Sequence, residues 1–298
     1  DLVGSVFADD STMMIDSILA AVNLDGTIRG NVVPNTNQHN TWDLGTNAVR
    51  FKDAYFEGNI KTNASSIALG QNASAGSEAI AIGKGTAGVG DYSQAIGNNA
   101  GNTGQGVAAV ALGSQSGETS QGDKAVAVGQ YAGKTSQGTQ SVAIGEKAGE
   151  TTQSAVAVAI GTQAGMTTQG LRAIAIGLQA AEITQAQDAI AIGSSAGYNN
   201  QGQSAIAIGA VAGNVNQAAR SIVISASNVA VNNIIEDSLV ITPIRSAVGT
   251  TMLMYDAGTG EVTHTASPVI TGDITGSVFG DDSTVLVDGN NNKIVGDI

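Results

Sequence analysis

The sequence has no cysteine, 3 prolines, 2 histidines and few aromatic residues, namely 1 Trp, 5 Tyr and 4 Phe among 298 residues. The absence of cysteine excludes a disulfide framework and a thiolate metal site. The scarcity of aromatic residues argues against an ordinary large globular core, although 42% of the residues are apolar. Ala, Ile and Val, which are small or β-branched, supply that fraction.

Basic residues are also scarce, because 12 Lys and Arg stand against 25 Asp and Glu, which gives a net charge of −13. A protein that binds nucleic acid needs a clustered basic face, so we predict no nucleic-acid partner. No apolar run approaches the ~18–20 residues that cross a bilayer. We therefore predict no membrane insertion.

What the sequence does have is glycine, 40 residues of it, and a repeat. Short runs such as AIAI each end in a glycine, and these glycines are 13, then 14, then seven times 16 residues apart. A fixed period of this kind is typical of solenoids. The glycines stand at 70, 83, 97, 113, 129, 145, 161, 177, 193 and 209.

Within each run, aliphatic residues alternate with alanine. Val158 and Ile160 flank Ala159, and equivalent triplets recur in every unit, with Gln94 in place of one aliphatic residue. Alternation with a period of two indicates a strand, and the glycine that ends each run stops a helix from forming. We therefore predict an all-β fold, a parallel β-solenoid (β-roll) of about ten coils of 13–16 residues, stacked ~4.8 Å apart.

We expect the Ile and Val side chains to point into the solenoid, which leaves the alanines as an apolar stripe outside. A strand with two apolar faces is normally covered on both. Two buried aliphatic residues per coil give only roughly 3–6 kcal/mol, against about 24 kcal/mol for ordering sixteen residues. The sequence therefore predicts an obligate oligomer, in which a second copy covers the stripe. The aliphatic residues assigned to the core include Ile144, Ile160, Ile176, Ile192 and Ile208.

A glutamine also recurs once per unit over eight coils. One interpretation is a strip of amides that faces a receptor. The other is a structural ladder, in which each amide bonds to its equivalents in the neighbouring coils, as stacked glutamines do in cross-β assemblies. We favour the ladder, because a receptor surface does not need identical residues at every level. The column is Gln105, Gln121, Gln137, Gln153, Gln169, Gln185, Gln201 and Gln217.

Units such as SVAIGEKAG (141–149) and SAIAIGAVAG (204–213) resemble the head repeats of trimeric autotransporter adhesins. The resemblance implies left-handed parallel β-rolls that associate side by side as a homotrimer. Similar repeats occur in the tail and surface fibres of phages and large viruses. The segment TWDLGTNAVRFKDAYFEGNI (41–60) looks like an element common in phage tail fibres, and this favours the viral branch.

We divide the chain into an N-terminal β module (1–60), the solenoid (61–227) and a C-terminal β connector with a hairpin module (228–298). The flanking modules are expected to hold three chains in register. GSVFADDST (4–12) recurs as GSVFGDDST (276–284), which suggests a modular array that continues beyond both ends. The aromatic residues expected to form an interchain plug at 42–56 are Trp42, Phe51, Tyr55 and Phe56.

These inferences favour a structural protein that is not an enzyme and has no cofactor or metal. We expect a segment of an elongated homotrimeric tail fibre or host-attachment fibre on a virion surface. The expected partners are other fibre or baseplate proteins and a glycan or protein of the host surface. The alternatives are a cellular trimeric surface adhesin and, further off, a polysaccharide-degrading solenoid enzyme or an ice-binding protein.

Three features carry a chemical alternative. Glu118 and Glu150, two coils apart, would suit a glycosidase, but Lys134 lies between them and a surface charge ladder explains all three. A threonine column would suit an ice plane, but it gives way to Ile183. Acidic turns would suit a divalent cation, but solvated carboxylates in a hairpin explain them. Those acidic residues are Asp9, Asp10, Asp281 and Asp282.

Overall fold

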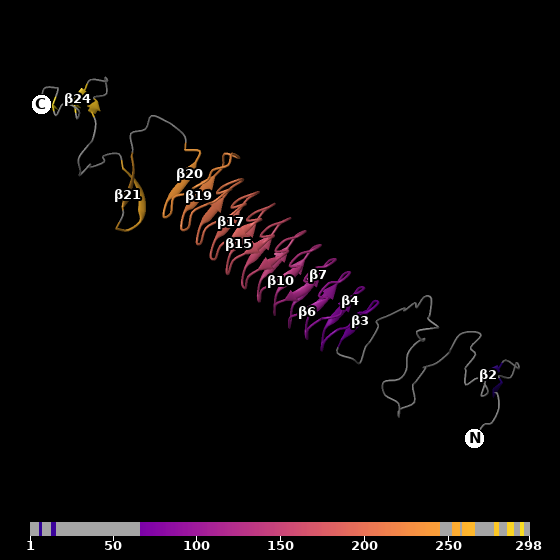
Figure 1. The fold of residues 1–298 in the computed structure, drawn as a ribbon. Helices are drawn as coiled ribbons and strands as arrows, with labels where there is room; N and C mark the ends of the chain where they lie inside the picture. The colour runs from indigo at the N-terminus through magenta and orange to yellow at the C-terminus, as the bar shows by residue number, and fades with distance from the viewer. Residues whose placement is uncertain are drawn as a thin grey trace. The chain divides into compact units, whose positions relative to one another are not determined.

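A computed structural model describes one long continuous segment of the chain and several short ones (Figure 1). The chain separates into two compact units, Asp1–Lys61 and Thr62–Ile298. Within the described ranges all regular structure is β-strand. In that part of the chain, no helix has the length and hydropathy to cross a membrane. The described residues are 6–7, 13–15, 66–244, 252–256, 258–265, 277–279, 285–288 and 293–294.

Residues 66–244 form a parallel β-solenoid, which confirms the predicted fold class. Its larger sheet has twelve strands, one from each successive coil. Neighbouring strands pair in parallel, with each residue opposite its equivalent in the next coil, so that Val142 lies opposite Val158 and Ile144 opposite Ile160. The strands are β3 (Ile67–Leu69), β4 (Ile80–Ile82), β5 (Gln94–Ile96), β7 (Val110–Leu112), β9 (Val126–Val128), β11 (Val142–Ile144), β13 (Val158–Ile160), β15 (Ile174–Ile176), β17 (Ile190–Ile192), β18 (Ile206–Ile208), β19 (Ile222–Ser225) and β20 (Leu239–Thr242).

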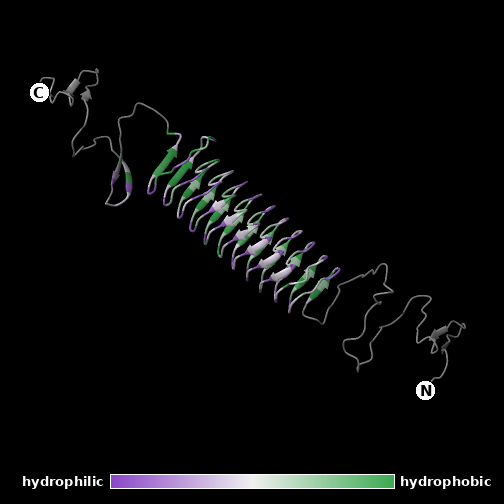
Figure 2. Cartoon of the chain, viewed as in Figure 1, coloured by the Kyte–Doolittle hydropathy of each residue, from purple (hydrophilic) through white to green (hydrophobic). Residues whose placement is uncertain are grey.

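A second parallel sheet of six strands is formed by the other half of the central coils. It pairs in the same manner, with Gln137 opposite Gln121 and Gln153. Figure 2 shows the green, hydrophobic strands of the twelve-stranded sheet repeated along the stack, whereas the strands of the smaller sheet are pale. The six strands are β6 (Thr103–Gln105), β8 (Thr119–Gln121), β10 (Thr135–Gln137), β12 (Thr152–Gln153), β14 (Thr168–Gln169) and β16 (Thr184–Gln185).

The repeated glycine after each strand of the larger sheet is required by the stacking of the coils. Gly161 has a φ of +125°, and a Cβ built on it would lie 2.5 Å from the carbonyl oxygen of Gly177 in the next coil. Both the backbone conformation and the close approach exclude a side chain there. The glycine period in the sequence therefore marks the points where successive turns touch.

Short antiparallel hairpins account for the remaining described strands. The recurring GSVF segments form hairpins with the same pairing, since Val6 lies opposite Ile15 and Val278 lies opposite Val287, each beside a register shift. The same nine-residue motif therefore specifies the same local structure in two places. These strands are β1 (Val6–Phe7) with β2 (Met13–Ile15), β21 (Met252–Asp256) with β22 (Glu261–Thr265), and β23 (Ser277–Phe279) with β24 (Val285–Asp288) and β25 (Lys293–Ile294).

We predict that Gly161→Ala lowers the free energy of unfolding by more than about 2 kcal/mol per chain, because the Cβ meets backbone that cannot move away. Gly104→Ser is the matched control. Gly104 also has a positive φ of +71°, but its Cβ position is open, and Ser120 occupies the same place in the next coil at a φ of +56°. Its cost should stay below about 1 kcal/mol. Denaturant titration followed by circular dichroism measures both, and equal losses would contradict the stacking argument.

Candidate functional site

The interior of the solenoid is lined by small residues, not by the aliphatic ones. Ala143, Ala159 and Ala175 in the larger sheet are fully buried, and so are Ala148 and Ala164 beyond the glycine turn. The expected orientation of the two columns is therefore wrong. The side chains of Ile144, Ile160, Ile192 and Ile208 lie on the outer face of the sheet, with 37–39% of each exposed, and Ile176 in the same column is half-buried.

The narrowness of the coil explains this inversion. A Cβ built on Gly101, in the turn opposite the larger sheet, would lie 3.2 Å from the Cβ of Ala95 and 2.6 Å from Oε1 of Gln105. The space between the two sheets thus holds one glutamine side chain and the methyl groups that face it. Isoleucine in place of alanine would overfill this interior.

Six hydrogen bonds connect the buried glutamines of seven successive coils into one amide ladder. Each Nε2 donates to Oε1 of the glutamine in the next coil, as Gln153 does to Gln169 at 2.9 Å. The same Nε2 also donates to a backbone carbonyl of the larger sheet, that of Val142 at 2.8 Å for Gln153. The column therefore has no surface to offer a receptor. The six ladder distances from Gln121 to Gln217 are 3.0, 3.1, 2.9, 3.1, 3.0 and 3.2 Å.

Both ends of the ladder are built differently from its middle. At the first end, Gln105 donates only to backbone carbonyls, and Oε1 of Gln121 has no partner among the described residues. At the other end Asn233 stands sixteen residues after Gln217 and is also buried. Its shorter amide bonds locally, to Oγ of Ser238 at 2.8 Å. Sequence reasoning missed Asn233, although its spacing from Gln217 was a usable signal.

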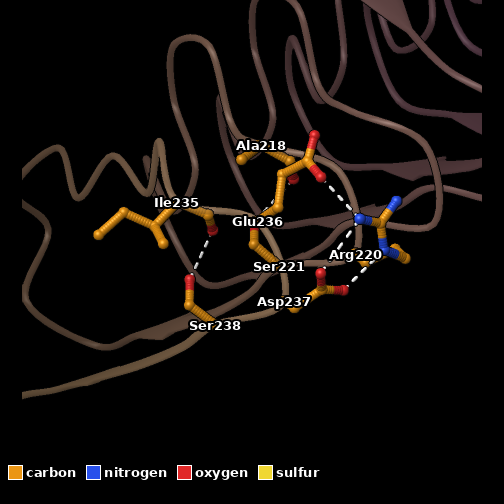
Figure 3. A network of polar contacts seen from close by, with 7 residues as sticks. All are labelled: Ala218, Arg220, Ser221, Ile235, Glu236, Asp237 and Ser238. Carbon is orange, nitrogen blue, oxygen red and sulfur yellow. Dashed lines mark hydrogen bonds and ion pairs between the residues drawn. The ribbon is translucent and has the colours of Figure 1, made fainter.

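A cluster of charged residues joins the last two coils, and Figure 3 shows it around Arg220. The guanidinium bonds the carboxylates of Asp237, at 2.6 and 3.1 Å, and of Glu236, at 2.6 Å. The hydrogen bonds from Arg220 hold the pKa of Asp237 below its ordinary value. Arg172 forms a similar two-point contact with Asp188 in the next coil, at 2.7 and 2.9 Å. These pairs tie neighbouring coils together at their exposed turns.

The carboxylates considered for catalysis are engaged in surface contacts. Lys134 lies 3.8 Å from Glu118 and 4.9 Å from the centre of the Tyr131 ring. Gln115 also donates to Glu118, at 3.0 Å. Among the described residues no three potential ligands are grouped for a metal ion. The geometry around Glu118 is thus that of a surface charge ladder.

Several residues singled out in the sequence lie outside the described residues, so their placement is not part of the site. They are Trp42, Phe51, Tyr55 and Phe56 of the expected plug, and Asp9, Asp10, Asp281 and Asp282 of the acidic turns.

The outer face of the larger sheet is the most extensive apolar surface of the described solenoid. Each strand presents two outward residues, and these form two aliphatic rows from β3 to β20. The outer face of the smaller sheet carries exposed hydroxyl side chains instead, such as Thr135 and Thr152. The coil is therefore two-faced, and the candidate functional site is the aliphatic face. Comparisons with protein-family models, with curated proteins and with solved structures gave no match.

We predict that Gln153→Glu destabilises the protein by about 3 kcal/mol or more at neutral pH, because a carboxylate cannot donate to Val142 or Gln169 and would be buried unpaired. A protonated carboxyl can donate. Folding therefore favours the neutral acid, and the loss should be small below the ordinary glutamate pKa of about 4.3 and grow as the pH rises above it. Gln153→Met, which adds no charge, should show a loss that does not change with pH. Denaturation at several pH values measures both.

The ion pair of Arg220 predicts the opposite pH dependence. Because the pKa of Asp237 is lowered in the folded state, its stabilising contribution is present above the ordinary aspartate pKa and is lost as the pH falls through the folded value. Arg220→Gln should lower the thermal midpoint slightly at neutral pH and leave it unchanged in acid. A difference that persists at about pH 2 would contradict this assignment.

Proposed function

We propose that this protein is a structural segment of a homotrimeric fibre on a virion surface, a tail fibre or host-attachment fibre, in which the solenoid serves as a stiff shaft. The chain contributes length and rigidity to this shaft and catalyses no reaction. Its partners are two further copies of itself, neighbouring fibre or baseplate proteins, and a molecule of the host surface.

The observation that carries the proposal is the pair of aliphatic rows on the larger sheet. Nine of the twelve residues in the outer row, from Leu69 to Ile241, are 36–53% exposed. Together they amount to roughly three to four fully exposed side chains, worth about 7 kcal/mol if covered. That is comparable with the whole net stability of an ordinary domain, about 5–15 kcal/mol. Such a stripe marks an interface.

Copies of the same chain are suitable occupants because the stripe is as regular as the coil. The outward residues repeat at every level, so a partner must present a surface with the same axial period along its whole length. A parallel copy of the solenoid has that period. The hydroxyl-bearing face of the smaller sheet then remains towards water.

Stiffness also supports a shaft. Each coil is held to the next by backbone hydrogen bonds of both sheets, such as Gly145 to Val128 at 2.8 Å, and by the buried amide ladder. Stacked coils leave no free strand edge except at the two ends. Bending would have to stretch many of these bonds together.

We predict that the chain of 298 residues has a solution mass of three times 29.6 kDa. Light scattering coupled to size exclusion measures it. A well-folded species of 29.6 kDa would contradict the fibre proposal, because the aliphatic face would then be stable in water.

The double variant Ile144→Asp with Ile160→Asp should abolish the trimer, since two charges per chain would be buried between the copies. Both residues are already partly exposed in the single chain, so their effect should be on assembly. Thr135→Asp with Thr152→Asp, on the smaller sheet, is the matched control and should leave the mass unchanged. If the isoleucine variant keeps the wild-type mass, the aliphatic face is not the interface.

A further inference from the structure

Gln94 interrupts the aliphatic face. The twelve strands of the larger sheet each have two outward positions, and Gln94 in β5 is the one residue among them that is not Ile, Leu or Val. Its backbone is held like that of its neighbours, paired with Ile80 on one side and Val110 on the other. Its carbonyl accepts a hydrogen bond from Gln105 at 3.0 Å. The side chain is exposed, and its amide makes no hydrogen bond with the described residues.

A face this regular does not define how partner chains align. A shift of one copy by one coil, ~4.8 Å along the rod, places aliphatic residues against aliphatic residues again. Apolar contact alone therefore favours many alignments almost equally, as in strands whose register is weakly specified. Some residue has to distinguish one coil from the next.

We propose that Gln94 sets the axial register of the assembled copies, an inference that rests on the proposed shaft. In the aligned assembly, the Gln94 amides of the copies lie at one level and can hydrogen-bond to one another. After a shift, each amide is buried against an aliphatic residue such as Val110 and has no partner. An unpaired buried amide disfavours that arrangement roughly tenfold or more. A single polar residue in an apolar seam has this effect in coiled coils.

Cysteine pairs can read the register, because the protein has no cysteine of its own. Chains with Ile160→Cys, carrying a size tag, are assembled with untagged chains that carry Ile192→Cys. Like positions in aligned copies come within the ~7 Å Cα separation that a disulfide spans. Unlike positions lie two coils, ~9.6 Å, apart along the rod and link only after a shift of two coils.

In the wild-type background we expect disulfides between like positions only. With Gln94→Val, the trimer should persist with an unchanged or higher thermal midpoint, while the yield of like links falls severalfold and unlike links appear. Gln130→Val is the control. Gln130 is an exposed glutamine in a turn, at a place where another coil has Leu178, and its replacement should leave the linking pattern as in the wild type.

Three results would overturn the proposal in distinguishable ways. If Gln94→Val keeps both the trimer mass and the wild-type linking pattern, the register is set elsewhere and the shaft proposal stands. If Gln94→Val dissociates the trimer, the residue contributes affinity and not alignment. If the wild-type chain is a monomer, the shaft proposal fails and this inference fails with it.

Discussion

The small distance between the two sheets of the coil is the constraint on which the rest of the structure depends. It admits alanine methyl groups, the glycine turns and one extended glutamine per coil, and nothing larger fits beside them. The bulky half of each alternating strand is therefore forced outward. A chain with an interior too small for its own hydrophobic residues has to use them for assembly, and this makes folding and association parts of one process.

The buried glutamines resolve a difficulty that such a core creates. Methyl groups alone give little stabilisation per coil, whereas an amide that bonds both to the next amide and to the opposite sheet connects three strands at once. The arrangement is repetitive and self-limiting. It ends where Asn233, one methylene shorter, turns its amide to the local backbone and to Ser238, beside the charged contacts of Arg220.

The sequence was sufficient to predict the solenoid, its period and its all-β character, because the glycine spacing and the two-residue alternation are local signals. It was not sufficient to decide which side of the strand faces inward. Val158, Ala159 and Ile160 are all apolar, and general hydrophobicity favours burying the larger pair. The answer depends on the width of the coil, which results from the glycine turns and from Gln169 on the opposite strand. Asn233 and Gln94 were visible only as exceptions to a column, and their meaning required the geometry.

The sixteen-residue coil also determines how such a rod can change over generations. Duplication or deletion of one whole coil alters its length by about 4.8 Å, yet preserves the glycine contacts, the ladder and both faces. An insertion of any other size breaks all of them at once. Length is therefore a quantity that recombination within the gene can adjust in discrete steps, while the two ends of the solenoid remain unchanged.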